Sequence, residues 1–372
     1  MELGSLSTPS LVLSRTVLEQ NAERMKSRAA DLNVQLRPHV KTAKCRQIAK
    51  LATTGNTPSI TVSTLTEAEY FADAGFQDIV YAVCITPDKL DRAASIAKHT
   101  QLHLITDCLS VADDVANHSS SHRVFIEIDC GEHRTGVLPE SDELLQIAER
   151  LTKTQRSRLS GVLTHAGHSY ACRNEHAMRA IAEEERAAAV LAAERLRAEG
   201  YEVPIVSVGS TPTACFAEHL QGVTEMRPGV YLLGDLFQAG IGTCGLEDIA
   251  ATVLTSVISR NLQTNTLVID AGGLALSKDR STQSTDFDAG FGRVARIDEG
   301  TPMDGVFIHE VHQEHGLIRL PEHLNAFDFP VGTRLRVYPN HICMTAAMYS
   351  HYEVYGTSLQ ITERWPRTNG WT

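Results

Sequence analysis

The sequence predicts an α/β fold in which an N-terminal TIM barrel, (β/α)8, is followed by an antiparallel β domain. Three observations support this prediction. Up to residue 247, short apolar segments alternate with helical segments about eight times. From residue 248 onward, strand-like segments are separated by turn residues and show little helical periodicity. The length of 372 residues is more than one simple domain usually has, and it suits two.

The predicted barrel spans residues 8–247. Thr66 can cap the helix that follows its second strand, and Gly75 can end that helix. The longest predicted helix is 176–200. An open doubly wound sheet is the alternative to a closed barrel. The eight strands are expected at 33–37, 59–65, 78–85, 101–106, 123–130, 160–167, 204–210 and 222–235.

The predicted β domain spans residues 248–372, and residues 1–7 can pack with it. Its segments are rich in β-branched and other apolar residues and are bounded by Gly, Pro, Asn and Asp. A barrel followed directly by a β domain creates a cleft of the kind that often binds small molecules. The strand-like segments lie at 249–260, 264–272, 292–296, 305–320 and 332–344.

The composition argues against several classes of partner. The formal net charge is −11, whereas nucleic acids and anionic membranes select basic surfaces. No stretch approaches the ~20 apolar residues of a membrane-spanning helix, and the N-terminus lacks the pattern of a secretory leader. The eight cysteines are scattered without a C-x-x-C pair, which favours a reducing compartment. We therefore expect a cytoplasmic protein that binds small molecules.

A lysine follows the first predicted barrel strand in the segment LRPHVKTAKC, residues 36–45. Lys41 would lie where that strand ends and before a helix, at the edge where α/β barrels hold their reactive residues. Burial or neighbouring cations make a lysine amine nucleophilic, and Arg37 and His39 are close in sequence. Lys41 is therefore a candidate for a Schiff base with an aldehyde cofactor. A solvated surface lysine is the alternative, because most lysines are exposed.

Two glycine-containing turns follow the last predicted barrel strands, where barrels commonly bind phosphate. The first, in 206–215, offers the hydroxyls of Ser210 and Thr211, and the second, in 226–235, offers Gly229. Backbone N–H groups at such turns and nearby hydroxyls can hold a phosphate group. The alternative is an ordinary turn followed by a helix that starts at a proline.

His341 and Cys343 are two residues apart in the segment YPNHICM, whose context is strand-like. On a strand both side chains would leave the same face. An imidazole and a thiolate are good ligands for Zn²⁺ and leave positions for water or substrate. The alternative is a half-buried strand with an incidental cysteine. Arg134 follows another barrel strand and can face a cofactor oxygen there, with an ordinary surface arginine as the alternative.

Eight segments carry a resemblance to a known family: RPHVKTAK, ITVSTLTEAE, EIDCGEHRTGV, GVLTHAGHSY, VSVGSTPT, GVTEMRPGVYLLGD, HQEHG and PNHIC. Together they resemble the fold-type III pyridoxal-phosphate enzymes of the D-serine dehydratase and D-threonine aldolase group, and within it most of all the hydroxyaspartate dehydratases. The segments run from residue 37 to residue 343 in family order. The resemblance implies an alanine racemase-like barrel with a β domain, pyridoxal 5′-phosphate as cofactor, a divalent metal and a homodimer.

The resemblance also implies roles for individual residues. Lys41 would bind the cofactor as a Schiff base, and Arg134 would contact the oxygen on its ring. Tyr170 would lie along the ring near the pyridine nitrogen, and Arg227 is a competing candidate for that contact. The phosphate would be surrounded by Ser210, Thr211, Gly229 and Val230, and the metal would be held by His341 and Cys343.

The metal pair distinguishes two reactions within this family. Its aldolases usually carry H-C-D, whereas its dehydratases carry H-x-C, and this chain has HIC. A thiolate ligand favours Zn²⁺, with Mg²⁺ or Mn²⁺ as the other options. The resemblance therefore implies a dehydratase that converts D-serine, D-threonine or D-threo-3-hydroxyaspartate to a 2-oxo acid and ammonia. The alternative is a D-threonine-type aldolase, which releases glycine and an aldehyde.

Three other interpretations explain less of the sequence. A racemase would share the fold but would give the metal pair no purpose, and non-catalytic pyridoxal-phosphate carriers resemble the barrel alone. A metal-binding structural protein would leave Lys41 and both phosphate-type turns unexplained.

A substrate with a second carboxylate would need a cation to receive it, and the candidates are Arg134, Lys278, Arg280 and His351.

Overall fold

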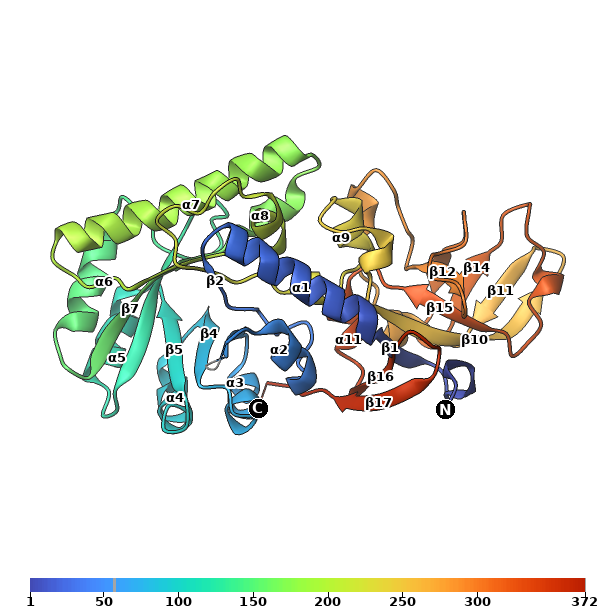
Figure 1. Ribbon diagram of the computed structural model, residues 1–372, viewed down its shortest axis with the longest axis horizontal. Coiled ribbons are helices and arrows are strands. Elements are labelled where there is room, and N and C mark those ends of the chain that lie inside the picture. Colours follow the sequence, from blue (N-terminus) through green and yellow to red (C-terminus); the bar gives the residue numbers. More distant parts are fainter. Residues whose placement is uncertain (56–57, 372) are drawn as a thin grey trace. The chain divides into compact units, whose positions relative to one another are not determined.

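The computed structural model describes residues 1–55 and 58–371, and its packing separates two compact units. The first unit contains residues 24–229 and the C-terminal tail, and the second contains residues 1–23 and 230–367. The first is built on a parallel sheet covered by helices, and the second on a mostly antiparallel sheet (Figure 1). Within the described ranges, no helix is both long and apolar enough to cross a membrane.

The described part of the first unit contains a parallel sheet of eight strands in the order β2-β9-β8-β7-β6-β5-β4-β3. The ends of this order meet, because His39 after β2 pairs with Thr61 in β3, and the Val40 N–H donates to the Thr61 carbonyl at 2.9 Å. The predicted barrel is therefore confirmed, and the open-sheet alternative is wrong. The strands are β2 (Gln35–Leu36), β3 (Ser59–Val62), β4 (Asp78–Cys84), β5 (Gln101–Thr106), β6 (His122–Ile128), β7 (Ser157–Thr164), β8 (Ile205–Val208) and β9 (Glu225–Met226).

Local signals explain where the barrel helices begin and end. The side chain of Thr64 caps α3 (Leu65–Asp73) by accepting a hydrogen bond from the Glu67 N–H at 3.0 Å. Thr66, the predicted cap, lies inside the helix instead. Gly75 has a φ of +90° directly after the helix, as its predicted role at the end requires. The other helices are α1 (Arg15–Asp31), α2 (Arg46–Ala52), α4 (Leu90–Ile96), α5 (Leu109–Asn117), α6 (Asp142–Thr152), α7 (Glu175–Ala198) and α8 (Thr211–Phe216).

The second unit confirms the predicted antiparallel β domain, with one parallel pair in its sheet. Strand β1 (Ser10–Ser14) lies between β10 (Ala251–Asn261), to which it is antiparallel, and β16 (His351–Tyr355), to which it is parallel. The other strands are β11 (Thr266–Ile269), β12 (Arg293–Arg296), β13 (Ile308–Val311), β14 (Gly316–Arg319), β15 (Arg334–Tyr338) and β17 (Ile361–Pro366), and the short helices are α9 (Leu236–Gly240), α10 (Gly273–Leu276) and α11 (Ile342–Ala346).

The start of the chain packs with this antiparallel sheet. Leu3 and Leu6 are buried in an apolar cluster with side chains of β1, β10 and β16. Burying these leucines stabilises the N-terminal segment, since each buried leucine contributes roughly 1.5–3 kcal/mol. The domain limits expected from the sequence, 8–247 and 248–372, remain predictions.

Candidate active site

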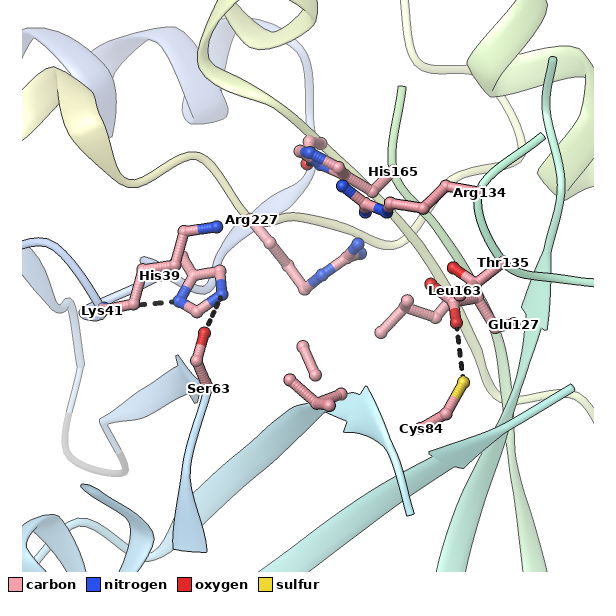
Figure 2. Close-up of a pocket in the computed structure, with 13 residues that line it drawn as sticks. His39, Lys41, Ser63, Cys84, Glu127, Arg134, Thr135, Leu163, His165 and Arg227 are labelled. Carbon is pink, nitrogen blue, oxygen red and sulfur yellow. Dashed lines mark hydrogen bonds between the residues drawn. The ribbon is translucent and has the colours of Figure 1, made fainter. Parts of the chain in front are cut away.

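A pocket of about 320 Å³ lies at the carboxyl ends of the barrel strands (Figure 2). Of the residues predicted from the sequence, Lys41, Arg134 and Arg227 line it. They follow β2, β6 and β9 respectively, so the barrel brings to one edge residues that are far apart in the chain. The other polar side chains on the wall, which were not predicted as site residues, are His39, Ser63, Cys84, Glu127, Thr135 and His165.

Lys41 lies in the loop between β2 and α2, with an exposed side chain. It forms no ion pair with any described residue. Lys44 differs, because its Nζ lies 3.1 Å from Oε1 of the buried Glu67. Lys44 therefore has a structural partner, whereas the amine of Lys41 remains available for chemistry.

Two imidazoles of the pocket are neutral. Burial and the nearby Lys41 lower the pKa of His39 well below its usual value. Its Nδ1 accepts a hydrogen bond from the Lys41 backbone N–H at 3.4 Å, so its proton is on Nε2, 3.4 Å from Ser63 Oγ. Burial lowers the pKa of His165 to about 3, although its Nδ1–H donates to the Gly209 carbonyl at 2.8 Å.

Arg227 is buried in the pocket wall and held by two short hydrogen bonds. Its Nη1 donates to Ser207 Oγ and its Nη2 to the Thr164 carbonyl, both at 2.6 Å. The Ser207 hydroxyl in turn donates to Glu225 Oε1 at 2.5 Å. Burial lowers the pKa of Arg227, while Glu225 opposes that change. The backbone of Arg227 can approach residue 209 closely because that residue is glycine. A Cβ there would lie 2.6 Å from the backbone nitrogen of Arg227.

On another part of the wall, the thiol of Cys84 and the carboxyl group of Glu127 lie close to the carboxyl group of Asp107, which does not line the pocket. Cys84 Sγ donates to Glu127 Oε2 at 3.1 Å and lies 3.5 Å from Asp107 Oδ1. Burial raises the pKa of Cys84 and of Glu127, so the thiol keeps its proton. Among the described residues, Cys84, Asp107 and Glu127 form the one group of three or more potential metal ligands whose ligating atoms all lie within 4.8 Å of one another. Their contact depends on the register of separate strands, which no sequence motif reveals.

The turn after β8 fits a phosphate group. Ser210 caps α8, because its Oγ accepts a hydrogen bond from the Thr213 N–H at 3.2 Å. The hydroxyl of Thr211 is buried and has no hydrogen-bond partner in the described part of the chain. A Cβ on Gly229 would collide with the His39 carbonyl, so glycine is needed for the two backbone segments to lie this close together. An unpaired buried hydroxyl beside glycine turns suits the phosphate of pyridoxal phosphate.

Five predicted cofactor residues do not line the pocket: Ser210, Thr211 and Gly229, described above, and Tyr170 and Val230. Tyr170 is half-buried in the 3₁₀ helix η3 (Gly167–Ala171). Ser169 in the same helix shares a 2.9 Å hydrogen bond with Ser210, so η3 adjoins the phosphate-type turn. Val230 is buried at the start of η4 (Val230–Leu232) in the second unit.

His341 and Cys343 do not lie on a strand, so that part of the prediction is wrong. His341 is the N-cap of α11, and Cys343 is in the first turn of this helix. The helix starts here because Asp235 fixes the backbone, accepting a hydrogen bond from the Ile342 N–H at 3.0 Å. The two side chains are nevertheless close enough for Cys343 to affect the pKa of His341.

A carboxylate orients the His341 ring. Nδ1 of His341 lies 2.9 Å from Asp279 Oδ2, which leaves Nε2 for a metal. Burial opposes the charged ring, but Asp279 and Cys343 raise the pKa of His341 to about 11. The hydrogen bond to His341 holds the pKa of Asp279 at about 2. An imidazole with a carboxylate partner and a neighbouring thiol fit a zinc site.

The candidate cations for a second substrate carboxylate have different surroundings. Arg134 Nη1 lies 3.2 Å from Glu132 Oε1, and more than half of its side chain is exposed. Arg280 pairs with Asp288 at 2.5 Å, and His351 lies 3.2 Å from a carboxylate oxygen of Glu353. Lys278 forms no ion pair with a described residue. Of the four candidates, Arg134 lines the barrel pocket.

Comparison with known proteins places the chain in a family. Residues 13–236 match the model for the alanine racemase N-terminal domain, and residues 250–355 match that for the serine dehydratase domain. The D-threo-3-hydroxyaspartate dehydratase of Delftia sp. strain HT23 is 40% identical, with 99% of each chain covered. The D-serine dehydratase of Dictyostelium discoideum is 32% identical, with 100% of this chain and 98% of that protein covered. A D-threonine aldolase of Arthrobacter sp. is 26% identical, over 91% of this chain and 86% of the aldolase.

Solved structures share the whole architecture. The Delftia dehydratase superposes with a TM-score of 0.95 at 40% identity, with 100% of both chains covered. An alanine racemase-like protein from Idiomarina loihiensis superposes with a TM-score of 0.94 at 39% identity, with 99% of both chains covered. The chain therefore belongs to the family of alanine racemase-like enzymes that carry a serine dehydratase domain after the barrel.

Proposed function

We propose that the protein is a pyridoxal 5′-phosphate- and divalent-metal-dependent dehydratase that converts a D-3-hydroxy amino acid to a 2-oxo acid and ammonia. The observation that carries this proposal is the amine of Lys41, which lines the barrel pocket and has no ion pair among the described residues. Identity of 40% and 32% with two dehydratases, against 26% with an aldolase, supports dehydration over cleavage.

The chemistry divides between bound groups and the chain. Pyridoxal phosphate, when bound, supplies a sink for electrons released at Cα, and a divalent cation supplies a Lewis acid for the β-hydroxyl. Lys41 would hold the cofactor through its amine, and the same amine, when free, would take the proton from Cα of the substrate. His39 and His165 are neutral at physiological pH, so each presents one N–H and one lone pair to its surroundings.

Other residues bind the cofactor in this proposal. Arg134 donates to the oxygen on the cofactor ring. Tyr170 and Arg227 are the two candidates for the pyridine nitrogen, and the position of Arg227 on the pocket wall favours it. The residues proposed to bind the phosphate are Ser210, Thr211, Gly229 and Val230.

His341 and Cys343 are the proposed metal ligands. The hydrogen bond between His341 Nδ1 and Asp279 supports this role, because it leaves Nε2 to bind the metal. One solved structure of a D-threo-3-hydroxyaspartate dehydratase, 40% identical to this chain, carries a cysteine-to-alanine mutation and is in the metal-free form. A thiolate ligand favours Zn²⁺, with Mg²⁺ or Mn²⁺ as the other options.

The proposed substrates are D-serine, D-threonine and D-threo-3-hydroxyaspartate. For the last, Arg134 is the proposed partner of the second carboxylate, because it lines the pocket and is partly exposed. We also propose a cytoplasmic homodimer. All eight cysteines are free, which suits a reducing compartment, and the dimer rests on the family resemblance.

Product analysis tests the reaction. The cofactor-loaded protein is incubated with each of the three substrates, with and without a chelator, and the carbon products are identified. We expect pyruvate, 2-oxobutanoate or oxaloacetate, with ammonia, and loss of these products after chelation. Glycine with an aldehyde would instead establish the aldolase, and product formation that survives complete metal removal would refute the metal requirement.

A further inference from the structure

A second cleft lies at the opposite edge of the barrel sheet, where strands β5 to β8 begin. Its volume is about 720 Å³, within the range of roughly 300–1,000 Å³ that is usual for small-molecule sites. Its walls come from the first residues of β5 and β7, from β6 and from the loop between α7 and β8. It shares no lining residue with the pocket that contains Lys41, so the two are separate sites on the barrel.

Two neighbouring arginines line this cleft, and neither is paired with a residue in the described part of the chain. Arg123 in β6 and Arg158 in β7 are paired in the sheet register, so their side chains leave the same face side by side. Neither forms an ion pair or a side-chain hydrogen bond with any residue that the structure describes. Like charges directly opposite each other destabilise a sheet. The chain has 45 acidic residues against 34 Lys and Arg, so this arrangement does not come from a shortage of carboxylates.

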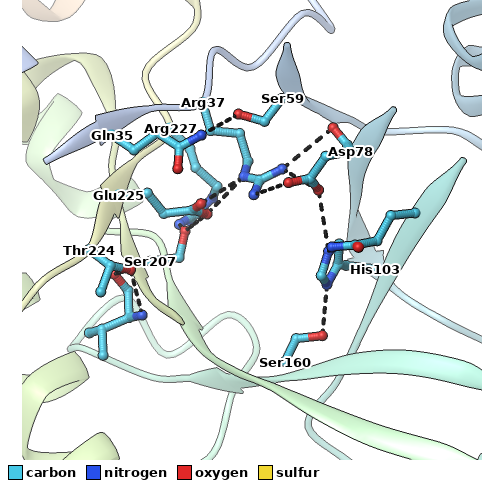
Figure 3. Close-up of polar contacts among 12 residues, drawn as sticks. Gln35, Arg37, Ser59, Asp78, His103, Ser160, Ser207, Thr224, Glu225 and Arg227 are labelled. Carbon is cyan, nitrogen blue, oxygen red and sulfur yellow. Dashed lines mark hydrogen bonds and ion pairs between the residues drawn. The ribbon is translucent and has the colours of Figure 1, made fainter. Parts of the chain in front are cut away.

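The carboxylates of Asp78 and Glu225, behind the cleft, already have partners, so they do not pair with Arg123 or Arg158 (Figure 3). His103 in β5 lies 2.7 Å from Ser160 Oγ and 3.2 Å from Asp78 Oδ1. Asp78 also pairs with the buried Arg37 at 2.8 Å, and Arg37 pairs with Glu225 at 2.8 Å. Burial opposes ionisation of Asp78, yet hydrogen bonds from His103 and Arg37 hold its pKa below the usual value. Both carboxylates are thus already engaged.

We propose that this cleft binds a small anion of the carboxylate or phosphate class through Arg123 and Arg158. A guanidinium group binds both kinds of anion with two parallel hydrogen bonds, and two adjacent forks suit a doubly charged ligand. The apolar wall of Leu159, Pro204 and Ile205 contacts the body of the ligand. Glu202 also lines the cleft and disfavours ligands that extend a further negative charge towards the loop after α7.

Calorimetric titration of the cofactor-loaded protein tests this site, with inorganic phosphate and succinate as separate probes. Bound cofactor occupies its own phosphate-binding residues, so a phosphate signal then reports another site. We expect saturable binding of at least one probe, weakened about tenfold or more by Arg123→Gln and by Arg158→Gln. Arg156→Gln is the matched control, because Arg156 is an exposed arginine in the same segment that does not line the cleft. The probe that binds more tightly identifies the class of anion.

Thermal unfolding separates binding from folding. Without a probe, both variants should unfold at or above the wild-type temperature, because each removes one of two like charges. The probe should raise the unfolding temperature of the wild type and of the control, and not that of the variants. Arg158→Lys keeps the charge without the fork and should bind with intermediate affinity. Absence of saturable binding of both probes, or phosphate binding of unchanged affinity in Arg123→Gln and Arg158→Gln, would overturn the proposal.

Discussion

The chemistry proposed for Lys41 and for His341 depends on whether the neighbouring side chains are charged or neutral. Lys44 is neutralised by the buried Glu67, whereas Lys41 has two neutral imidazoles nearby and no ion pair among the described residues. At the proposed metal site the arrangement is the reverse, since a carboxylate holds the His341 ring. Each arrangement predicts the effect of one substitution.

Asp279→Asn should weaken zinc binding. The change removes the negative charge from His341 Nδ1 and with it part of the basicity and fixed orientation of the ring, which typically costs about 10–100-fold in metal affinity. Competition with a chromophoric chelator measures that affinity independently of turnover. Asp298→Asn, at an exposed position, is the control and should bind zinc as the wild type does. Equal affinities of Asp279→Asn and the wild type would show that Asp279 does not position the ligand.

His165 should make the protein sensitive to acid. Its pKa is about 3 in the folded state against 6.5 ordinarily, so between these values the unfolded chain binds a proton that the folded chain does not. The free energy of unfolding therefore falls as the pH decreases below about 6.5, by ~1.4 kcal/mol per pH unit for this one group.

Urea unfolding at pH 7, 6 and 5 measures this contribution. The free energy of unfolding of His165→Gln should decline less steeply than that of the wild type, by the amount given above. His323→Gln, at an exposed position, should keep the wild-type slope. If His165→Gln also kept that slope, His165 would not be a buried group that stays neutral in the folded state.

At the scale of secondary-structure elements, the turn between β8 and α8 positions several polar groups in and beside the pocket. Gly209 adopts a φ of +134° and leaves no room for a Cβ beside Arg227, while its carbonyl accepts the hydrogen bond from His165. The next residue, Ser210, caps α8. One short turn thus holds a cation, an imidazole and the phosphate-type hydroxyls in place.

Gly209→Ala should destabilise the barrel more than a glycine substitution with open space around it. Gly200 provides the comparison, because its φ of +87° is also positive but a Cβ at this position would have nothing within 4 Å. Both changes carry backbone strain, and only the first adds a collision with backbone atoms. We expect Gly209→Ala to cost at least ~2 kcal/mol more than Gly200→Ala in the free energy of unfolding. Equal costs in urea titrations would contradict the close packing of this turn.

The sequence predicts those features that depend on local order along the chain. Alternating strand and helix signals predict the barrel, and position directly after a strand predicts Lys41 and Arg134 as site residues. The family resemblance adds Arg227, and all three line the pocket. The contact of Cys84 with Glu127 depends on three-dimensional pairing across strands, and Asp279 is 62 residues from His341. Neither contact has a signal in the sequence.

The incorrect prediction of a strand at His341 and Cys343 has two causes. Strand β15 ends at Tyr338, and the predicted strand continues past Pro339 and Asn340, which separate this strand from His341. The carboxylate of Asp235, 107 residues earlier in the chain, binds the Ile342 N–H and thereby favours a helix over a continued strand. Long-range hydrogen bonds of this kind lie outside what local patterns can predict.

At the scale of the whole molecule, the antiparallel sheet draws on both ends of the chain. Strand β1, near the N-terminus, lies between β10 and β16, and the preceding segment buries Leu3 and Leu6 against these strands. The second unit therefore depends on residues that precede the barrel in sequence.

Leu3→Ala should destabilise the antiparallel unit. Leu3 is fully buried, so the change removes apolar contacts and leaves a cavity, at a cost of about 2–5 kcal/mol. Leu262→Ala is the control, because that side chain is more than half exposed. Urea unfolding followed by the fluorescence of Trp365, which lies in β17 of the same unit, should report the difference. Equal midpoints for the two variants would show that the N-terminal segment contributes little.

The proposed function depends above all on Lys41 as the residue that holds an aldehyde cofactor. The most direct test is to load the protein with pyridoxal phosphate, reduce it with borohydride and locate the modified lysine by peptide mass spectrometry. We predict a single phosphopyridoxyl group on Lys41, its absence in Lys41→Ala, and its retention in Lys50→Ala, an exposed lysine of α2. A modified lysine elsewhere in the chain, or no modification at all, would show that Lys41 does not hold the cofactor.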